Sequence, residues 1–111
     1  MASYRIQEIL KYFEQSVIDS GINVHKIVLF GSRSHENFTD ESDIDIAIIS
    51  DDFIDKDLFE RAEMAGETVW NTIKKYKIAL DVIKLTVDEY ENETRMIASY
   101  VKEGKVVYSS N

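Results

Sequence analysis

The stretch DIDIAIIS, residues 43–50, is the feature that most limits how this chain can fold. Its isoleucines recur at every second position, which is the pattern of a strand that buries at least one face. Asp43 and Asp45 are two positions apart, so their carboxylates project from the same face, roughly 7 Å apart along the chain. Two partly desolvated carboxylates repel each other and resist ionisation. The arrangement is therefore costly unless a cation or a basic group lies between them.

The remaining apolar patterns predict a small mixed β-sheet with helices packed on it, an α/β (α+β) fold. The chain has 111 residues, enough for one modest core but not two, so we expect a single domain over residues 1–111. Phe53, Phe59, Trp70 and Tyr76 are expected in the core rather than on a base-stacking surface. We expect helices at 4–19, 58–77 and 86–103, and strands at 24–30, 43–50, 78–85 and 105–108.

Charge and composition narrow the range of partners. The formal net charge is -8, which argues against a protein that holds long nucleic acid through its backbone, because such binders carry clustered positive charge. There is no cysteine, so neither disulfides nor thiolate metal sites are expected. No apolar run approaches the roughly 20 residues of a membrane helix, and no signal sequence is recognisable. We therefore expect a cytoplasmic protein that does not associate with membranes.

Gly31 and Ser32 directly follow the predicted strand 24–30 and form the second feature of interest. A glycine there lets the backbone turn sharply and present N–H groups to an anion. Taken alone, this pair is most simply a turn. Ten residues further along the chain, however, comes the Asp-x-Asp pair. Phosphate-directed donors beside metal-directed carboxylates are the equipment of phosphoryl or nucleotidyl transfer.

The segment GSRSHENFTDESDID, residues 31–45, resembles the nucleotidyltransferase signature of the DNA polymerase beta superfamily. The short chain also resembles the minimal members of that superfamily, the MNT proteins that pair with HEPN-domain toxins, and its segments LDVIKL and EGKVVY are similar to theirs. The resemblance implies that a Gly-Ser loop holds the nucleotide phosphates, that the Asp-x-Asp pair binds Mg²⁺, and that an acid on a neighbouring strand completes the site. These positions correspond to Gly31 and Ser32, to Asp43 and Asp45, and to Asp81.

The three acids suggest a two-metal mechanism at the α-phosphorus of a nucleoside triphosphate. Two divalent ions roughly 3.5–4 Å apart would bridge the triphosphate and the attacking oxygen, and oxygen ligands favour magnesium or manganese. Asp81 would take up or relay the proton of the attacking hydroxyl, provided that its strand lies beside that of Asp43. Arg33 either contacts phosphate or pairs with an acid of its own loop. Ser42 either helps to bind the nucleotide or caps the loop.

The predicted function is transfer of a nucleoside monophosphate, AMP from ATP, to a hydroxyl of a protein partner. The family resemblance points to a HEPN toxin as that partner, which would be neutralised within a hetero-oligomer. The alternative is an interaction module that keeps the fold but neutralises a HEPN partner only by binding it. Three converging carboxylates favour the enzyme, since a protein that only binds has no reason to tolerate their repulsion.

Overall fold

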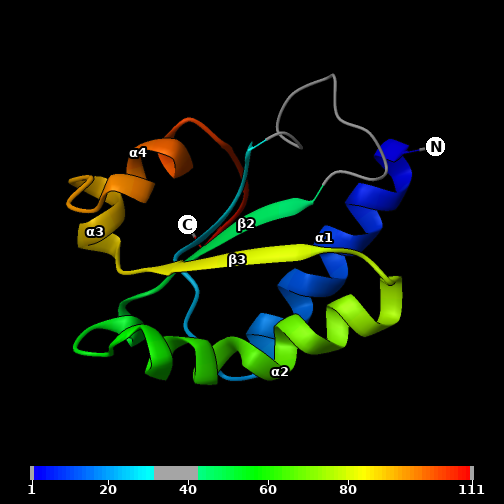
Figure 1. The fold of residues 1–111 in the computed structure, drawn as a ribbon, viewed down its shortest axis with the longest axis horizontal. Coiled ribbons are helices and arrows are strands. Elements are labelled where there is room, and N and C mark those ends of the chain that lie inside the picture. Colours follow the sequence, from blue (N-terminus) through cyan, green and yellow to red (C-terminus); the bar gives the residue numbers. More distant parts are fainter. Residues whose placement is uncertain (1, 32–42, 111) are drawn as a thin grey trace.

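A four-stranded mixed sheet forms the centre of the molecule (Figure 1). The computed structural model describes residues 2–31 and 43–110. The strands are β1 (Lys26–Phe30), β2 (Ile44–Ile49), β3 (Leu80–Leu85) and β4 (Lys105–Ser109). They lie in the order β3-β2-β1-β4, with β1 antiparallel to both β2 and β4, and β2 parallel to β3. The mixed sheet predicted from the sequence is therefore confirmed.

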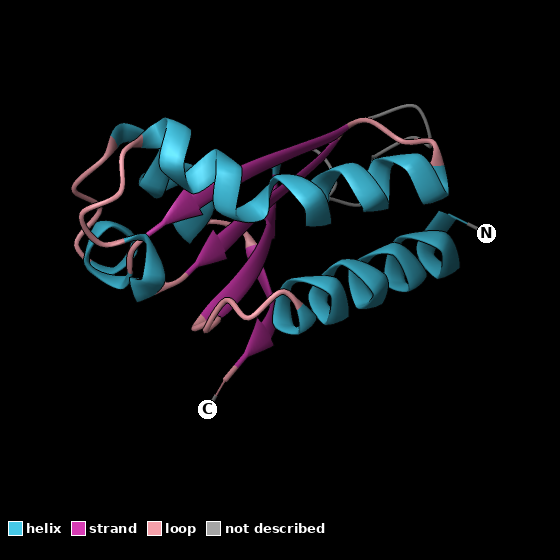
Figure 2. Ribbon diagram, turned by 90° about the horizontal axis from the view of Figure 1, so that it is seen from below, coloured by secondary structure: helices cyan, strands magenta, loops and turns pink. Residues whose placement is uncertain are grey.

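Helices cover both faces of this sheet (Figure 2). The long helices α1 (Ala2–Asp19) and α2 (Leu58–Tyr76) lie on one face, and the short helices α3 (Val87–Glu91) and α4 (Met96–Lys102) lie on the other. Strand β2 serves both cores: Ile44, Ile46 and Ile48 pack towards α1 and α2, whereas Ala47 and Ile49 pack towards α3 and α4. Burying each of these isoleucines stabilises the folded state by roughly 1.5–3 kcal/mol relative to an exposed side chain. β2 is therefore an inner strand, buried on both sides.

Local sequence signals set several helix boundaries. At the start of α3, Thr86 accepts a hydrogen bond from the Glu89 backbone N–H, and the Glu89 side chain accepts one from the Thr86 N–H. This is the capping box predicted from the sequence. The same motif, made by Asp57 and Glu60, opens α2, which ends at Lys77 in a left-handed conformation with φ of 52°. Within the described part of the chain, none of the helices has the length and hydropathy needed to span a bilayer.

The single helix predicted at 86–103 is wrong, because two helices separated by a turn occupy this segment. Helix α3 stops at Asn92, and Glu93 has a φ of 49°, which an α-helix does not allow. The Thr94 N–H then donates to the Glu89 carbonyl at 3.2 Å, closing the turn. The break redirects the chain so that Ala98 and Val101 of α4 are buried in the core against the sheet.

The aromatic residues expected in the core divide into two groups. Phe53 is fully buried and Tyr76 is half-buried, as predicted. Phe59 and Trp70, however, are 87% and 58% exposed, so the prediction is wrong for both. The residues of α2 that are buried are instead Arg61, Ala65, Thr68 and Thr72, spaced three or four residues apart.

Candidate active site

Strand pairing places two of the predicted acids next to each other. Asp45 of β2 lies directly opposite Asp81 of β3 in the parallel register. Both side chains share the face of the sheet that α3 and α4 cover further along, since Ala47 and Ile49 follow Asp45 at alternate positions. Neighbouring strands are roughly 4.8 Å apart, so the two carboxylates are close neighbours. Asp43 is exposed and immediately precedes β2, at the end of the sheet where β2 and β3 begin (Figure 1).

Gly31 connects the two halves of the motif. It follows β1, whose last residue Phe30 pairs with Asp45, and its φ of 72° lies in the left-handed region that favours glycine. A Cβ atom at this position would overlap Oδ2 of Asp45 and would lie only 3.1 Å from its Cγ. The Gly31 backbone is thus packed against the Asp45 carboxylate. Both the backbone conformation and the available space require glycine here.

Among the described residues, negative charge predominates around Asp45. Burial, the Asp81 carboxylate and the Asp43 carboxylate, in that order of importance, raise the pKa of Asp45 above its ordinary value of 3.8. Among the ion pairs between described residues, none includes these three acids. Lys84 lies three residues along β3 from Asp81, but its Nζ donates to the Val82 carbonyl at 2.9 Å. Burial lowers the pKa of Lys84, and the charge of Asp81 opposes this shift.

The donor set suits a hard divalent cation. Carboxylate oxygens are the ligands that magnesium and manganese prefer, and a cation would relieve the repulsion that raises the pKa of Asp45. Across residues 2–31 and 43–110, no three acidic or histidine side chains already converge as a closed metal site. Asp43, Asp45 and Asp81 are therefore neighbouring ligand candidates, and a cation would have to draw them together.

The predicted site residues fall into two sets. The structure places Gly31 beside Asp45 and Asp45 beside Asp81, although 36 positions separate these two acids in the chain. The proposed nucleotide contacts Ser32, Arg33 and Ser42 lie outside the described residues. Lys84 on β3, the basic residue three positions after Asp81, was not predicted from the sequence. Its signal is a lysine within the apolar run LDVIKL, three residues after the acid.

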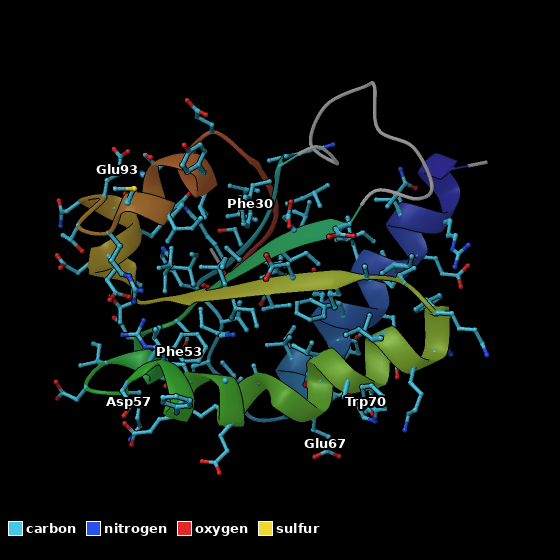
Figure 3. The ribbon with its side chains drawn as sticks, viewed as in Figure 1. Phe30, Phe53, Asp57, Glu67, Trp70 and Glu93 are labelled. Carbon is cyan, nitrogen blue, oxygen red and sulfur yellow. The ribbon has the colours of Figure 1, made fainter. Side chains whose placement is uncertain are left out.

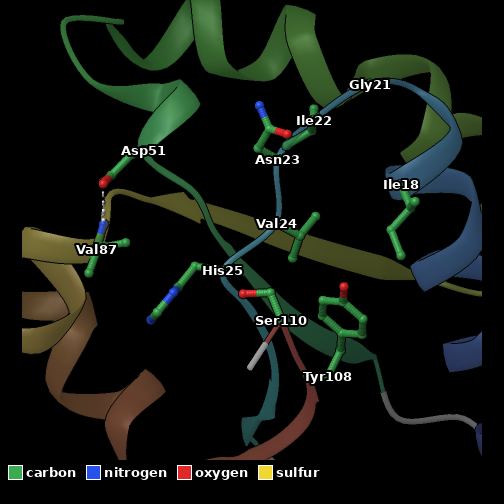
Figure 4. A pocket seen from close by; sticks show the side chains of 10 residues that line it. All are labelled: Ile18, Gly21, Ile22, Asn23, Val24, His25, Asp51, Val87, Tyr108 and Ser110. Carbon is green, nitrogen blue, oxygen red and sulfur yellow. Dashed lines mark hydrogen bonds between the residues drawn. The ribbon is translucent and has the colours of Figure 1, made fainter.

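A pocket lies elsewhere in the molecule (Figure 4). It has a volume of about 570 Å³ and is lined by residues that include His25, Asp51 and Ser110. The His25 N–H donates to the carbonyl of Ile49, the last residue of β2, so the pocket lies at the end of the strands opposite the aspartates. Asp51 Oδ1 already accepts the Val87 N–H at 3.2 Å. This pocket is therefore separate from the acid pair.

The fold and the paired acids define a small α/β domain of the nucleotidyltransferase type. The family model described as "Polymerase beta, Nucleotidyltransferase" matches residues 7–111, and the chain therefore belongs to this family. Membership makes the chain a relative of enzymes that transfer nucleotidyl groups. No curated protein matches the sequence significantly.

Several solved structures share the fold. A candidate nucleotidyltransferase from Sulfolobus solfataricus superposes with a TM-score of 0.74 at 22% identity, over 96% of this chain and 83% of that one. A toxin–antitoxin structure with AMP-PNP superposes with a TM-score of 0.63 at 20% identity, covering 91% of this chain and 73% of that one. The toxin–antitoxin MntA–HpeT, in a variant with two Asp-to-Glu changes, gives 0.55 at 19% identity, covering 95% and 73%.

Proposed function

We propose that this protein is a metal-dependent nucleotidyltransferase that moves AMP from ATP to a hydroxyl of a protein partner. The observation that carries the proposal is the pairing of Asp45 with Asp81 on one face of the sheet, with the Gly31 turn packed against Asp45. Family membership and a similarly folded toxin–antitoxin structure containing AMP-PNP support it. The MntA–HpeT variant changes two aspartates that are two positions apart, the same spacing as Asp43 and Asp45.

Each residue has a distinct role in this proposal. Asp43, Asp45 and Asp81 would hold magnesium or manganese, which supplies positive charge that stabilises the phosphoryl transition state. Asp81 accepts or relays the proton of the acceptor hydroxyl. Gly31 and Ser32 present backbone N–H groups to the triphosphate, with Arg33 and Ser42 as further nucleotide contacts. The close packing of Gly31 fixes the position of the Asp45 carboxylate relative to this loop.

The proposed acceptor is a HEPN-domain toxin, bound in a hetero-oligomer in the cytoplasm. Two of the similarly folded structures are toxin–antitoxin pairs. The formal net charge of -8 disfavours a nucleic acid acceptor through backbone repulsion. A folded protein can position its own hydroxyl by docking a whole surface, whereas a small alcohol cannot.

The test is to incubate the protein with magnesium and α-labelled ATP, adding a HEPN protein, transfer RNA or small alcohols in separate reactions. We expect label on the HEPN protein only. Asp43→Asn and Asp45→Asn should reduce labelling by orders of magnitude, because each removes charge from the proposed ion site. Asp55→Asn is the matched control, since Asp55 is exposed with a φ of 61° that asparagine tolerates.

Each contrary outcome has a definite meaning. Label that appears only on RNA or on an alcohol contradicts the protein acceptor. An Asp43→Asn/Asp45→Asn double variant that transfers nucleotide at the parent rate contradicts the catalytic role of the acids. If this double variant still neutralises the toxin without labelling it, binding alone is sufficient for neutralisation.

A further inference from the structure

The outer side of α2 exposes apolar side chains that the core does not use. Phe59 and Trp70, at 87% and 58% exposure, lie on this side. Ala62 and Gly66, also exposed, lie between them. Because the spacings are three, four and four residues, these positions follow one side of the helix. We call Phe59, Ala62, Gly66 and Trp70 the α2 stripe.

Neither the backbone conformation nor the packing of the described residues requires glycine at position 66. It lies in the interior of a 19-residue helix, where glycine is destabilising relative to alanine. Its φ is not in the left-handed region, and no atom lies within 4 Å of the place that a Cβ would take. The missing side chain therefore leaves open space on the outside of α2. Such a gap, with an aromatic side chain exposed on each side of it along the stripe, lets the backbone of another helix approach closely.

An acidic groove runs beside the α2 stripe. Glu63 and Glu67 of α2 and Asp19 of α1 line a depression of about 420 Å³ together with hydroxyl groups of both helices. Glu67 projects away from the sheet (Figure 3). At the far end of the stripe, Lys74 Nζ lies 5.9 Å from the centre of the Trp70 ring. The surface is therefore apolar along the stripe and negatively charged along its flank.

The negative charge beside the α2 stripe distinguishes between two possible occupants, a second copy of this chain and a basic helix of another protein. In a symmetric antiparallel pair of α2 helices centred on Gly66, Glu63 and Glu67 of both copies would lie along the same flank of the contact. Like charges at these positions repel, so a second copy fits poorly. A helix with lysine or arginine beside its apolar side would instead place positive charge in the acidic groove.

We propose that the α2 stripe and the acidic groove together form a docking surface for a basic amphipathic helix of a partner protein. Helix α2 packs on the face of the sheet opposite to that of Asp45 and Asp81. A partner docked on α2 leaves the acid pair accessible. Docking therefore does not depend on the proposed nucleotide transfer.

The probe is a synthetic helix of about 20 residues, long enough to follow α2, with alanines on its apolar side and lysines on the flank. A peptide with glutamates in place of the lysines is the control. Trp70 is the only tryptophan in the chain, so its fluorescence reports contact at this surface. We expect the basic peptide to bind and to shift the Trp70 emission to shorter wavelengths, and the acidic peptide to do neither. Asp45→Asn should bind the basic peptide as the parent does.

Substitutions at Gly66 separate docking from folding. Gly66→Ala and Gly66→Gln should raise the thermal midpoint, because both residues favour helix and the space is open. They should nevertheless weaken peptide binding progressively, and Gly66→Gln by at least about tenfold. Glu63→Lys/Glu67→Lys should shift the preference to the acidic peptide, whereas the same exchange at exposed acids of the other layer, Glu93 and Glu103, should not.

Three results would overturn the proposal. The first is no binding of the basic peptide, or binding without a change in Trp70 emission. The second is equal affinity of the parent and Gly66→Gln, which would indicate unspecific charge attraction. The third is self-association of the parent, measured by sedimentation and lost in Gly66→Gln, which would assign the α2 stripe to a second copy of this chain.

Discussion

Replacing Asp45 with asparagine should stabilise the metal-free protein, although it removes a central residue of the candidate site. The substitution keeps the shape of the side chain and removes one charge from a group of three. Burial and the charges of Asp81 and Asp43 raise the pKa of Asp45, which means that its ionised form is unfavourable in the folded state. Asparagine carries no such penalty.

The size of the effect follows from the strand pairing. Adjacent strands are roughly 4.8 Å apart, so carboxylates at paired positions are separated by about 5 Å. At a water-like dielectric constant, two unit charges at that distance repel by about 0.8 kcal/mol, and partial burial raises this value. Solvent screening limits the gain at this half-exposed position to about 1 kcal/mol. For a domain of this size, that corresponds to roughly 3–7 °C in thermal midpoint.

The assay is thermal unfolding followed by circular dichroism, in EDTA and then in excess magnesium. In EDTA, Asp45→Asn should melt above the parent, whereas magnesium should stabilise the parent more than the variant. Asp55→Asn makes the same change in net charge at an exposed position and controls for general repulsion. If Asp45→Asn melts at or below the parent in EDTA, the carboxylates do not repel as the register implies, and the cation site loses its physical basis.

The pH dependence provides a second check on Asp45. Its pKa is raised above 3.8 in the folded state, so folding takes up protons between that value and the folded-state pKa. The destabilisation is therefore absent in strong acid, grows as the pH rises through this range, and is complete above the folded-state pKa. The difference between Asp45→Asn and the parent should increase from acidic to neutral pH. A constant difference would contradict this origin.

Two further predictions concern packing and a buried ion pair. Gly104→Ala should lower the free energy of unfolding by about 1–3 kcal/mol, because the new Cβ would lie 2.6 Å from the Leu29 carbonyl oxygen. Gly66→Ala should instead raise it by roughly 1 kcal/mol, since the space there is open. Urea unfolding measures both changes. Glu89→Gln should cost about 3 kcal/mol, because Arg61, whose side chain is 7% exposed, loses its charged partner at 2.7 Å. Burial raises the pKa of Glu89, but hydrogen bonds from Arg61 and the Thr86 backbone and the nearby arginine charges outweigh it and leave the pKa below 4.5. The Arg61–Glu89 pair should therefore stabilise the parent above pH 4.5, and this stabilisation should be lost as the pH falls through the folded-state pKa of Glu89. If Glu89→Gln loses stability in acid as steeply as the parent does, the ion pair does not have this role.

The sequence by itself determined the features that depend on neighbours along the chain. The alternation in DIDIAIIS predicted a buried strand with both acids on one face, because side chains alternate across a strand with a period of two. Thr86 and Glu89 predicted a helix start, because both partners of a capping box lie within four residues. Gly31 was recognised as a turn residue, since glycine tolerates a positive φ.

Tertiary structure decided everything that depends on contacts between distant residues. Asp81 belongs to the site only because β3 pairs in parallel with β2, in the register that sets it opposite Asp45. Helix α2 turns Arg61, Thr68 and Thr72 inwards and Trp70 outwards, the reverse of what the polarity of these side chains predicts. The inward-facing polar groups are hydrogen-bonded, which offsets the cost of burying them: Arg61 donates to the Lys84 carbonyl and to Glu89, and Thr72 donates to the Thr68 carbonyl. Most of those partners come from β3 and α3, far along the chain, so no local pattern could reveal that Arg61 faces the core.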